Sequence, residues 1–361
     1  MIRFDETFRL PLAHFLYHLS VALLNDINPT SLNLTIYFSV IVLALANTAL
    51  AGILWYYLQK YTDNFSPYII MLIILSILLL TPASLLKLNF DNPNYYAAYF
   101  HSNPLHNPTF IFARPFTLLL TLMSISIFGQ KKLSVLNTIT MIIVIVLGIL
   151  AKPNYIIAFL LALCLFAIWR FFHKQPVQWR SLIFAIAIPA IIILSWQFYI
   201  TYTVDTTILN TPEATDESVG ISPFTVMILH IGKTGLSAYL TIIINFFLSI
   251  LFPLFLWILF PQSRQEKVFT LSWITFIIAA LQGWLLVENG SRMGNGNFIW
   301  GGHFALFVLY AISGIIAMKL RVYKNRDWRF LWLLMIVILQ LASGIMWVIY
   351  SWNDPTGVTF W

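Results

Sequence analysis

The sequence is poor in charged residues and in cysteine. Charged residues fill only 9% of its 361 positions, whereas a soluble domain carries about 25%. A single cysteine, Cys164, lies inside an apolar run, which excludes disulfides and cysteine-based metal sites. Hydrophobic residues make up 60% of the chain and aromatic residues 16%. This composition is typical of a polytopic membrane protein.

Several well-known catalytic patterns are missing as well. The sequence contains no HExxH, CxxC, P-loop or GxSxG pattern, so it does not support a zincin, a dithiol redox protein, a nucleotide hydrolase or a serine hydrolase. Residues 1–9 show no cleavable signal pattern. Any site must therefore be built from the polar residues that lie between the apolar runs.

Apolar runs of about twenty residues, the length that crosses a bilayer core, recur along the chain. They predict one transmembrane domain over residues 1–361, an all-α bundle of about ten spans. An amphipathic juxtamembrane helix is expected at 10–25, and outer-face loops at 87–115, 204–238 and 288–303. The predicted spans are 34–58, 68–86, 109–128, 135–151, 154–172, 181–203, 239–261, 268–287, 298–318 and 330–350.

The basic residues divide unevenly between the two sides that these spans define. Thirteen of the twenty Lys and Arg residues fall on the side that includes Lys131 and Lys132. Short loops rich in Lys and Arg face the cytoplasm, so this side is predicted to be cytoplasmic. The net charge of +7 is thus a topology signal, and nucleic acid is not needed to explain it.

The same count puts both ends of the chain outside, with no span before the first. Either residues 1–33 cross the membrane after synthesis, or one more N-terminal helix is missing from this reading frame. We expect the second, because one more helix would place the N-terminus inside. Ten of thirteen Asp and Glu residues and six of seven His residues fall on the outer side. Titratable groups gathered at one membrane face favour an outward-facing active site. The alternative is that longer outer loops simply collect more polar residues.

The stretch Asn89–Pro115 carries polar groups and four prolines between two apolar runs. Irregular backbone this close to lipid must be buried in protein or line a water-filled cavity. Asp91 is a candidate catalytic carboxylate, and Arg114 is suited to clamp a phosphate. The alternative is an ordinary loop with interfacial histidines. Further candidate substrate-binding residues here are His101, His106 and Asn107.

Three other outer elements supply candidates. Asp5 and Glu6 precede the amphipathic helix and are candidate catalytic carboxylates, able to act as a base or to bind a metal, unless they belong to a frayed terminus. Lys152, at a tight turn between apolar runs, either snorkels to the head groups or offers a charge to an anionic ligand. The glycine-rich stretch 288–303 either lets backbone approach a ligand or merely reconnects two spans. Candidate substrate-binding residues in these elements are His14, His18, Lys152, Glu288, Arg292, Asn297 and His303.

Three short segments resemble motifs of the polytopic glycosyltransferases of the C-type (GT-C) superfamily, in an uncharacterised bacterial branch. In that superfamily a first transmembrane helix precedes an outer loop with a catalytic Asp or Glu, followed by a surface helix. Asp5 and Glu6 occupy comparable places, although a missing first helix would leave the true carboxylate upstream of Met1. The segments are 106–109 with 114–116, 151–154, and 288–292 with 296–298.

The resemblance implies transfer of a sugar from a polyprenyl-phosphate donor to an acceptor at the outer face of a bacterial cytoplasmic membrane. A carboxylate would act as general base, and Arg292, Arg114 and Lys152 would stabilise the departing lipid phosphate. The implied partners are this donor and membrane lipid. Metal dependence varies in the superfamily, so the cofactor is unknown and a divalent metal is left open. The sequence indicates neither donor sugar, acceptor nor oligomeric state. The alternatives are a transporter or flippase of a lipid-linked or amphiphilic anion and a non-catalytic envelope-assembly protein.

Overall fold

The computed structural model describes residues 15–25, 32–62, 65–84, 100–102, 107–203, 218–231, 234–289, 293, 296–324 and 327–353. Within these ranges almost all regular structure is helical, and the two strands are three residues long each. The predicted all-α transmembrane bundle is therefore confirmed as a fold class.

The helices and strands follow one another along the chain with short connections. They are α1 (Leu16–Asn25), α2 (Leu32–Gln59), α3 (Pro67–Leu79), α4 (Pro108–Ser124), α5 (Val135–Ala151), α6 (Asn154–Phe172), α7 (Trp179–Ser181), α8 (Ile188–Thr203), β1 (Val219–Ile221), α9 (Thr225–Ile231), α10 (Gly235–Leu259), α11 (Lys267–Leu285), β2 (Leu286–Glu288), α12 (Asn297–Lys319) and α13 (Trp328–Asn353). A 3-10 turn (Ile125–Phe128) extends α4, and a π-helical stretch (Leu182–Ala187) joins α7 to α8.

Eight of the described helices are long and apolar enough to cross a membrane, which makes the chain a multi-pass integral membrane protein. The other two predicted spans, 68–86 and 135–151, correspond to α3 and α5, which have 13 and 17 residues. At 1.5 Å per residue, α3 is only about two thirds as long as the hydrocarbon core is thick. The sequence pattern thus found the apolar segments but overestimated how many of them are long helices.

Helix α3 ends early for a local reason. It begins with a standard signal, since the Ser66 side chain accepts a hydrogen bond from the Ile69 N–H (3.4 Å) and Pro67 follows at the first helical position. It ends before Thr81-Pro82, because a proline disfavours helical backbone in the residue ahead of it. The irregular residues that follow are buried, and the Ala83 N–H donates to the Leu248 carbonyl at 3.1 Å.

All three of the expected outer loops are partly helical. Helix α4 starts at Pro108, so residues 108–115 belong to a helix and Pro115 lies inside it. Helix α12 starts at Asn297, so residues 297–303 are helical as well. The loop expected at 204–238 contains β1, α9 and the start of α10. Strand β1 pairs antiparallel with β2, with Val219 opposite Glu288.

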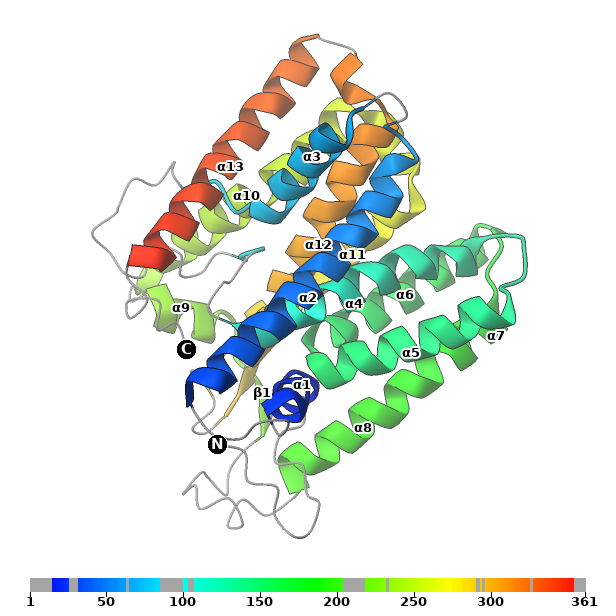
Figure 1. Ribbon diagram of the computed structural model, residues 1–361, viewed down its shortest axis with the longest axis vertical. Helices are drawn as coiled ribbons and strands as arrows, with labels where there is room; N and C mark the ends of the chain where they lie inside the picture. The colour runs from blue at the N-terminus through cyan, green and yellow to red at the C-terminus, as the bar shows by residue number, and fades with distance from the viewer. Residues whose placement is uncertain are drawn as a thin grey trace.

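Helix α12 forms the centre of the bundle, because every residue from Ile299 to Ile316 is buried. It is packed against α11, α6, α10, α4 and α2. Figure 1 shows α2 crossing in front, with α3, α10 and α13 on one side and α5 and α8 on the other. The outer helices expose many large apolar side chains, such as Leu45, Leu72 and Ile192, which suits helices surrounded by lipid.

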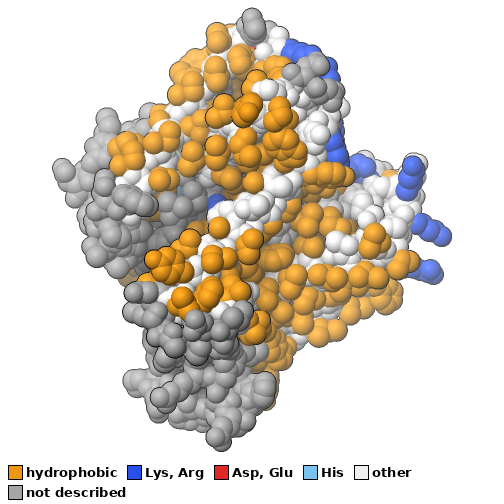
Figure 2. Space-filling model, viewed as in Figure 1, with side chains coloured by type: hydrophobic (Ala, Val, Ile, Leu, Met, Phe, Trp, Pro, Cys, Tyr) orange, Lys and Arg blue, Asp and Glu red, His pale blue; other side chains and the backbone are white. Residues whose placement is uncertain are grey.

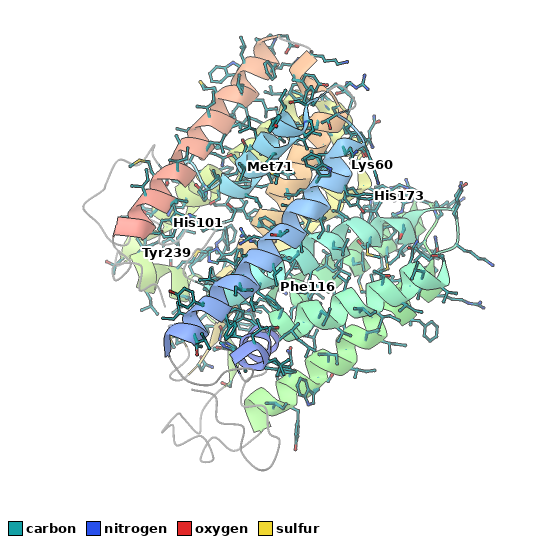
Figure 3. The ribbon with its side chains drawn as sticks, in the orientation of Figure 1. Lys60, Met71, His101, Phe116, His173 and Tyr239 are labelled. Atoms are coloured by element: carbon teal, nitrogen blue, oxygen red, sulfur yellow. The ribbon has the colours of Figure 1, made fainter. Side chains whose placement is uncertain are left out.

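Basic side chains gather at one end of this bundle, which we call the basic end. In Figure 2 the Lys and Arg side chains form a band along the upper right edge of the molecule, and Figure 3 places Lys60 and His173 toward that edge and His101 away from it. Exposed members of the basic end are Lys60, Lys131, Lys132, Lys174, Arg180, Arg264, Lys267, Lys319, Arg321 and Lys324.

Candidate functional site

The three motif segments that the sequence singles out meet away from the basic end. The Asn154 amide of the 151–154 turn donates to the Asn297 carbonyl at 2.6 Å. The Asn297 amide in turn donates to Glu288 Oε2 at 2.5 Å. The Lys152 ammonium donates to Thr109 Oγ1 at 3.3 Å. We call this group, together with Trp300, the Lys152 site.

Lys152 is held by the turn between α5 and α6. Its N–H donates to the Gly148 carbonyl at 2.9 Å, which ends α5, and Pro153 then opens α6. The side chain is only 6% exposed, and its Nζ lies 4.0 Å from the centre of the Trp300 ring. A cation over an indole face is stabilised by the ring quadrupole.

No carboxylate among the described residues lies within ion-pair distance of the Lys152 ammonium. Its two polar neighbours, a threonine hydroxyl and an indole face, carry no charge. Burial therefore lowers the pKa of Lys152 to about 7 from its ordinary value of 10.5. Near neutral pH the group holds its proton only weakly, and an added negative charge would restore it.

Asn107 caps helix α4. Its Oδ1 accepts hydrogen bonds from the Phe110 N–H at 2.9 Å and from the Thr109 hydroxyl at 2.7 Å. Because the Thr109 proton points to Asn107, the lone pairs of its oxygen are available to the Lys152 ammonium. Asn107 thus reaches Lys152 through Thr109 in this structure, although the sequence suggested that it binds substrate directly.

Two successive glycines let α12 come close to its neighbours. A Cβ built on Gly301 would lie 3.0 Å from the Asn154 carbonyl oxygen, and one on Gly302 would lie 2.3 Å from the Phe100 ring. Neither position has room for a larger residue without movement. These glycines therefore bring Trp300 and His303 against both the 151–154 turn and the 100–102 segment.

The two described histidines of this region are linked through the backbone. The His101 N–H donates to His303 Nδ1 at 2.7 Å, so the neutral ring of His303 carries its proton on Nε2. The His303 ring also meets Trp300 edge-on, with centroids 5.1 Å apart. The His101 ring lies 5.0 Å from that of Trp347 on α13. Both histidines are buried, so the 100–102 segment is fastened to α12 and α13.

Arg114 lies further along α4, in the second turn of the helix. It is 4% exposed, its Nη2 donates to Asn47 Oδ1 on α2 at 2.8 Å, and its guanidinium lies 5.2 Å from the Phe307 ring. The Phe110 ring contacts both this guanidinium and Trp300, with centre distances of 5.9 and 6.2 Å. A buried cation at this depth in a membrane helix is an indicator of function.

His18 lies on α1, next to the Tyr17 ring at 5.1 Å, and burial lowers its pKa. It is not among the residues that hydrogen bonds join to Lys152. Asp5, Glu6, His14, Asp91, His106 and Arg292 lie outside the described residues, so their candidate roles stay predictions. Among the described residues no group of three or more His, Cys, Asp or Glu side chains could hold a metal.

Sequence reasoning missed Trp300 and Asn47, which contact Lys152 and Arg114 respectively. Trp300 is one of thirteen tryptophans, and nothing in its spacing distinguishes it from a core residue. Asn47 carries a better signal, because an amide inside an apolar span is costly unless it finds a partner. Asn154 and Thr109 were inside the motif segments but were not chosen as candidates.

The fold and this site together define a multi-pass membrane protein with buried cations near one end of its helices. No family model, curated protein or solved structure matches the chain. The assignment of a reaction therefore depends on the residues themselves.

Proposed function

We propose that this protein transfers a sugar from a polyprenyl-phosphate-linked donor to an acceptor at the extracytoplasmic face of a bacterial cytoplasmic membrane. The observation that carries the proposal is the buried Lys152, a cation without a described carboxylate partner. An isolated buried charge is unfavourable unless something compensates it. A ligand phosphate would provide that compensation, and Trp300 and Thr109 would leave the ammonium free to turn toward it.

The depth of the site suits a lipid phosphate. Lys152 lies in the turn where α5 and α6 meet, at the end of two apolar helices rather than at their middle. Head-group phosphates lie at the ends of membrane-spanning segments, while the tails extend along them. A polyprenyl chain would then lie against the apolar helix surfaces, with its phosphate at Lys152.

In the proposed reaction, the acceptor hydroxyl attacks the anomeric carbon of the donor sugar. The bond between that carbon and the phosphate oxygen breaks, and its electron pair leaves with the lipid phosphate. The hydroxyl proton passes to a carboxylate acting as general base. Protonated Lys152 would stabilise the charge that develops on the leaving phosphate.

The general base is to be sought among four carboxylates. Glu288 is the described one that hydrogen bonds tie to the site, through Asn297 and Asn154. Its Oε2 accepts a hydrogen bond from the Asn297 amide, which fixes the carboxylate next to the 151–154 turn. Asp5, Glu6 and Asp91 are the other candidates, from the sequence alone. Arg292 would join Lys152 in holding the phosphate.

A transporter or flippase of a lipid-linked anion is the second candidate, and the short helix α3 favours it. Helices that stop inside the membrane and continue as buried irregular backbone are frequent at transporter binding sites. A transporter would bind the same phosphate at Lys152 and Arg114, but it would release the donor with its sugar still attached.

Two assays, of sugar transfer in nanodiscs and of donor movement across liposomes, distinguish these functions. The full chain in lipid nanodiscs is incubated with a polyprenyl-phosphate sugar labelled in the sugar, together with pooled envelope acceptors, and the label is followed by chromatography. The proposal expects loss of label from the lipid, reduced about a hundredfold in Lys152→Gln and unchanged in Lys132→Gln. Donor moved across liposomes with its sugar intact would identify a transporter. Donor that neither binds nor reacts would end both proposals.

A further inference from the structure

Two cations at the basic end converge on one oxygen atom. The Phe128 carbonyl, at the end of the 3-10 turn after α4, accepts a hydrogen bond from Arg170 Nη2 at 3.2 Å. It also accepts one from Lys267 Nζ at 3.0 Å. The two charged nitrogens therefore lie no farther apart than the sum of these distances. Carbonyl oxygens satisfy the hydrogen bonds of both groups, but like charges repel at this range, so a nearby anion would stabilise the pair.

The acidic residues near Arg170 and Lys267 do not neutralise these two cations. Glu266, which directly precedes Lys267, pairs with Lys319 at 2.7 Å. Asp327 pairs with Arg329 at 2.6 Å. Among the described residues no carboxylate lies within ion-pair distance of Arg170 or Lys267. Arg170 is only 3% exposed, so water screens its charge poorly.

The helix that starts here adds to the positive charge. Lys267 is the first residue of the 19-residue helix α11, and the Glu266 side chain does not cap it. A helix N-terminus carries a partial positive charge, so a lysine in the first turn is unfavourably placed. Free N–H groups and a positive dipole at a helix N-terminus attract anions. Two cations thus meet at the Phe128 carbonyl, and one of them, Lys267, is the first residue of a helix without a side-chain cap.

Exposed aromatic side chains near Arg170 indicate how deep this residue lies relative to the membrane surface. Trp169, Phe172 and Trp179 are 47%, 75% and 40% exposed and flank the end of α6. Exposed tryptophans of membrane proteins gather at the level of the lipid head groups. The Arg170 guanidinium lies 5.4 Å from the Phe128 ring and 5.7 Å from the Phe166 ring, which hold it in place.

We propose that Arg170, Lys267 and the N-terminus of α11 bind the phosphate of an anionic membrane lipid at the basic end. Basic pockets between membrane helices bind such head groups on the cytoplasmic side. The phosphate would accept hydrogen bonds from both side chains and relieve their repulsion. This site is separate from the Lys152 site and does not depend on the proposed sugar transfer.

A thermal-shift measurement on the full chain in detergent tests the site. The probes are phosphatidylglycerol, the zwitterionic phosphatidylcholine and inorganic phosphate, each titrated while the unfolding temperature is followed. The variants are Lys267→Gln, which removes one cation, and Lys267→Arg, which keeps it. Lys132→Gln is the matched control. Lys132 is exposed in the loop after Phe128, and this substitution removes the same charge as Lys267→Gln.

Phosphatidylglycerol is expected to raise the unfolding temperature of the wild type, while phosphatidylcholine does not. Lys267→Gln should need about ten times more phosphatidylglycerol for the same rise, since a hydrogen bond to a charged group is lost. Lys267→Arg and Lys132→Gln should respond like the wild type. The same pattern is expected in a Lys152→Gln background, which removes the other phosphate site.

Three results would overturn this inference. One is an equal response of Lys267→Gln and Lys132→Gln, which would mean that only net charge matters. Another is an equal effect of phosphatidylcholine, which would remove the role of the anion. The third is a full effect of inorganic phosphate alone, which would show that a free ion rather than a lipid occupies the site.

Discussion

At the basic end, Lys319 and Arg329 each pair with a carboxylate, and both cations are partly exposed, by 37% and 41%. At the Lys152 site, a lysine of the same chemistry is 6% exposed and rests on an indole ring. Exposed pairs of the first kind contribute little to stability, and their clustering reports topology. A buried cation of the second kind is unfavourable by itself, and we propose that a ligand phosphate compensates it.

Arg114 and Arg170 sharpen the comparison. Both are buried, but the Arg170 guanidinium donates to the carbonyls of Phe128 and Pro176, whereas that of Arg114 donates to a side-chain amide on another helix. Carbonyls at the end of a helix or turn are natural partners for arginine. An arginine joined to an asparagine inside the bundle has no such routine explanation.

The largest effect on sugar transfer is expected from substitution of Arg292, whose role is predicted from the sequence alone. Arg292→Ala should lower the rate of sugar transfer about a hundredfold or more, because a donor aimed at developing charge is lost. Arg292→Lys should fall between this variant and the wild type, since lysine keeps the charge but not the planar fork. Arg180→Ala, at the basic end, is the control. Rates are compared at equal amounts of folded protein, and wild-type activity in Arg292→Ala would remove Arg292 from the site.

Binding of the donor should depend on pH through Lys152. Burial lowers the pKa of Lys152 to about 7, so the cationic form that binds phosphate is lost as the pH rises through that value. Affinity for a polyprenyl phosphodiester, whose own charge is constant, should fall by up to about tenfold per pH unit above 7. Lys152→Arg should lose this dependence, because arginine stays protonated. A flat wild-type profile between pH 6 and 9 would contradict a role for the Lys152 charge.

Substitution of glycine by alanine tests how tightly the helices pack at the Lys152 site compared with α2. Gly301→Ala should destabilise the protein by about 1–3 kcal/mol, because the new Cβ would meet the Asn154 carbonyl at 3.0 Å. Gly52→Ala on α2, where nothing lies within 4 Å of the added atom, should be neutral or stabilising. Unfolding temperatures of the two variants would measure this difference, and equal values would show that α12 does not pack as closely as described.

A smaller effect concerns stability without ligand. Unfolded Lys152 regains a pKa near 10.5, whereas the folded value is about 7. Between these values the unfolded state binds more protons, so stability should rise with pH. Lys152→Met removes the penalty and should raise the unfolding temperature at pH 7 by a few degrees, since 1 kcal/mol shifts it by about 2–4 °C. Lys319→Met should change it by less. A lower unfolding temperature in Lys152→Met would mean that Lys152 stabilises the fold.

The fold was readable from the sequence where one local pattern decides the outcome. Runs of about twenty apolar residues gave the membrane spans. The pattern failed at 68–86, where Thr81-Pro82 ends α3 although the apolar run continues. It could not give the β1–β2 pair either, because Val219 and Glu288 are far apart in the sequence and strands of three residues have no clear periodicity.

The polar residues of the candidate site could be predicted from the sequence, but its apolar residues could not. Lys152, Asn297, Glu288 and His303 stand out because they interrupt apolar segments. Trp300 does not, since its role comes from the three-dimensional meeting of α12 with the 151–154 turn. That meeting depends on Gly301, for which the sequence suggested close approach to a ligand or a reconnecting loop, and not the packing of two helices.

Photo-crosslinking tests the central claim, that the Lys152 site holds a lipid phosphate, most directly. A polyprenyl phosphate with a diazirine next to its phosphate is irradiated with the full chain in nanodiscs, and adducts are mapped by mass spectrometry. We predict adducts on residues around Lys152, such as Trp300 and Phe110, that excess unlabelled polyprenyl phosphate removes and Lys152→Gln abolishes. Adducts confined to the basic end around Lys267, and unchanged in Lys152→Gln, would contradict the claim.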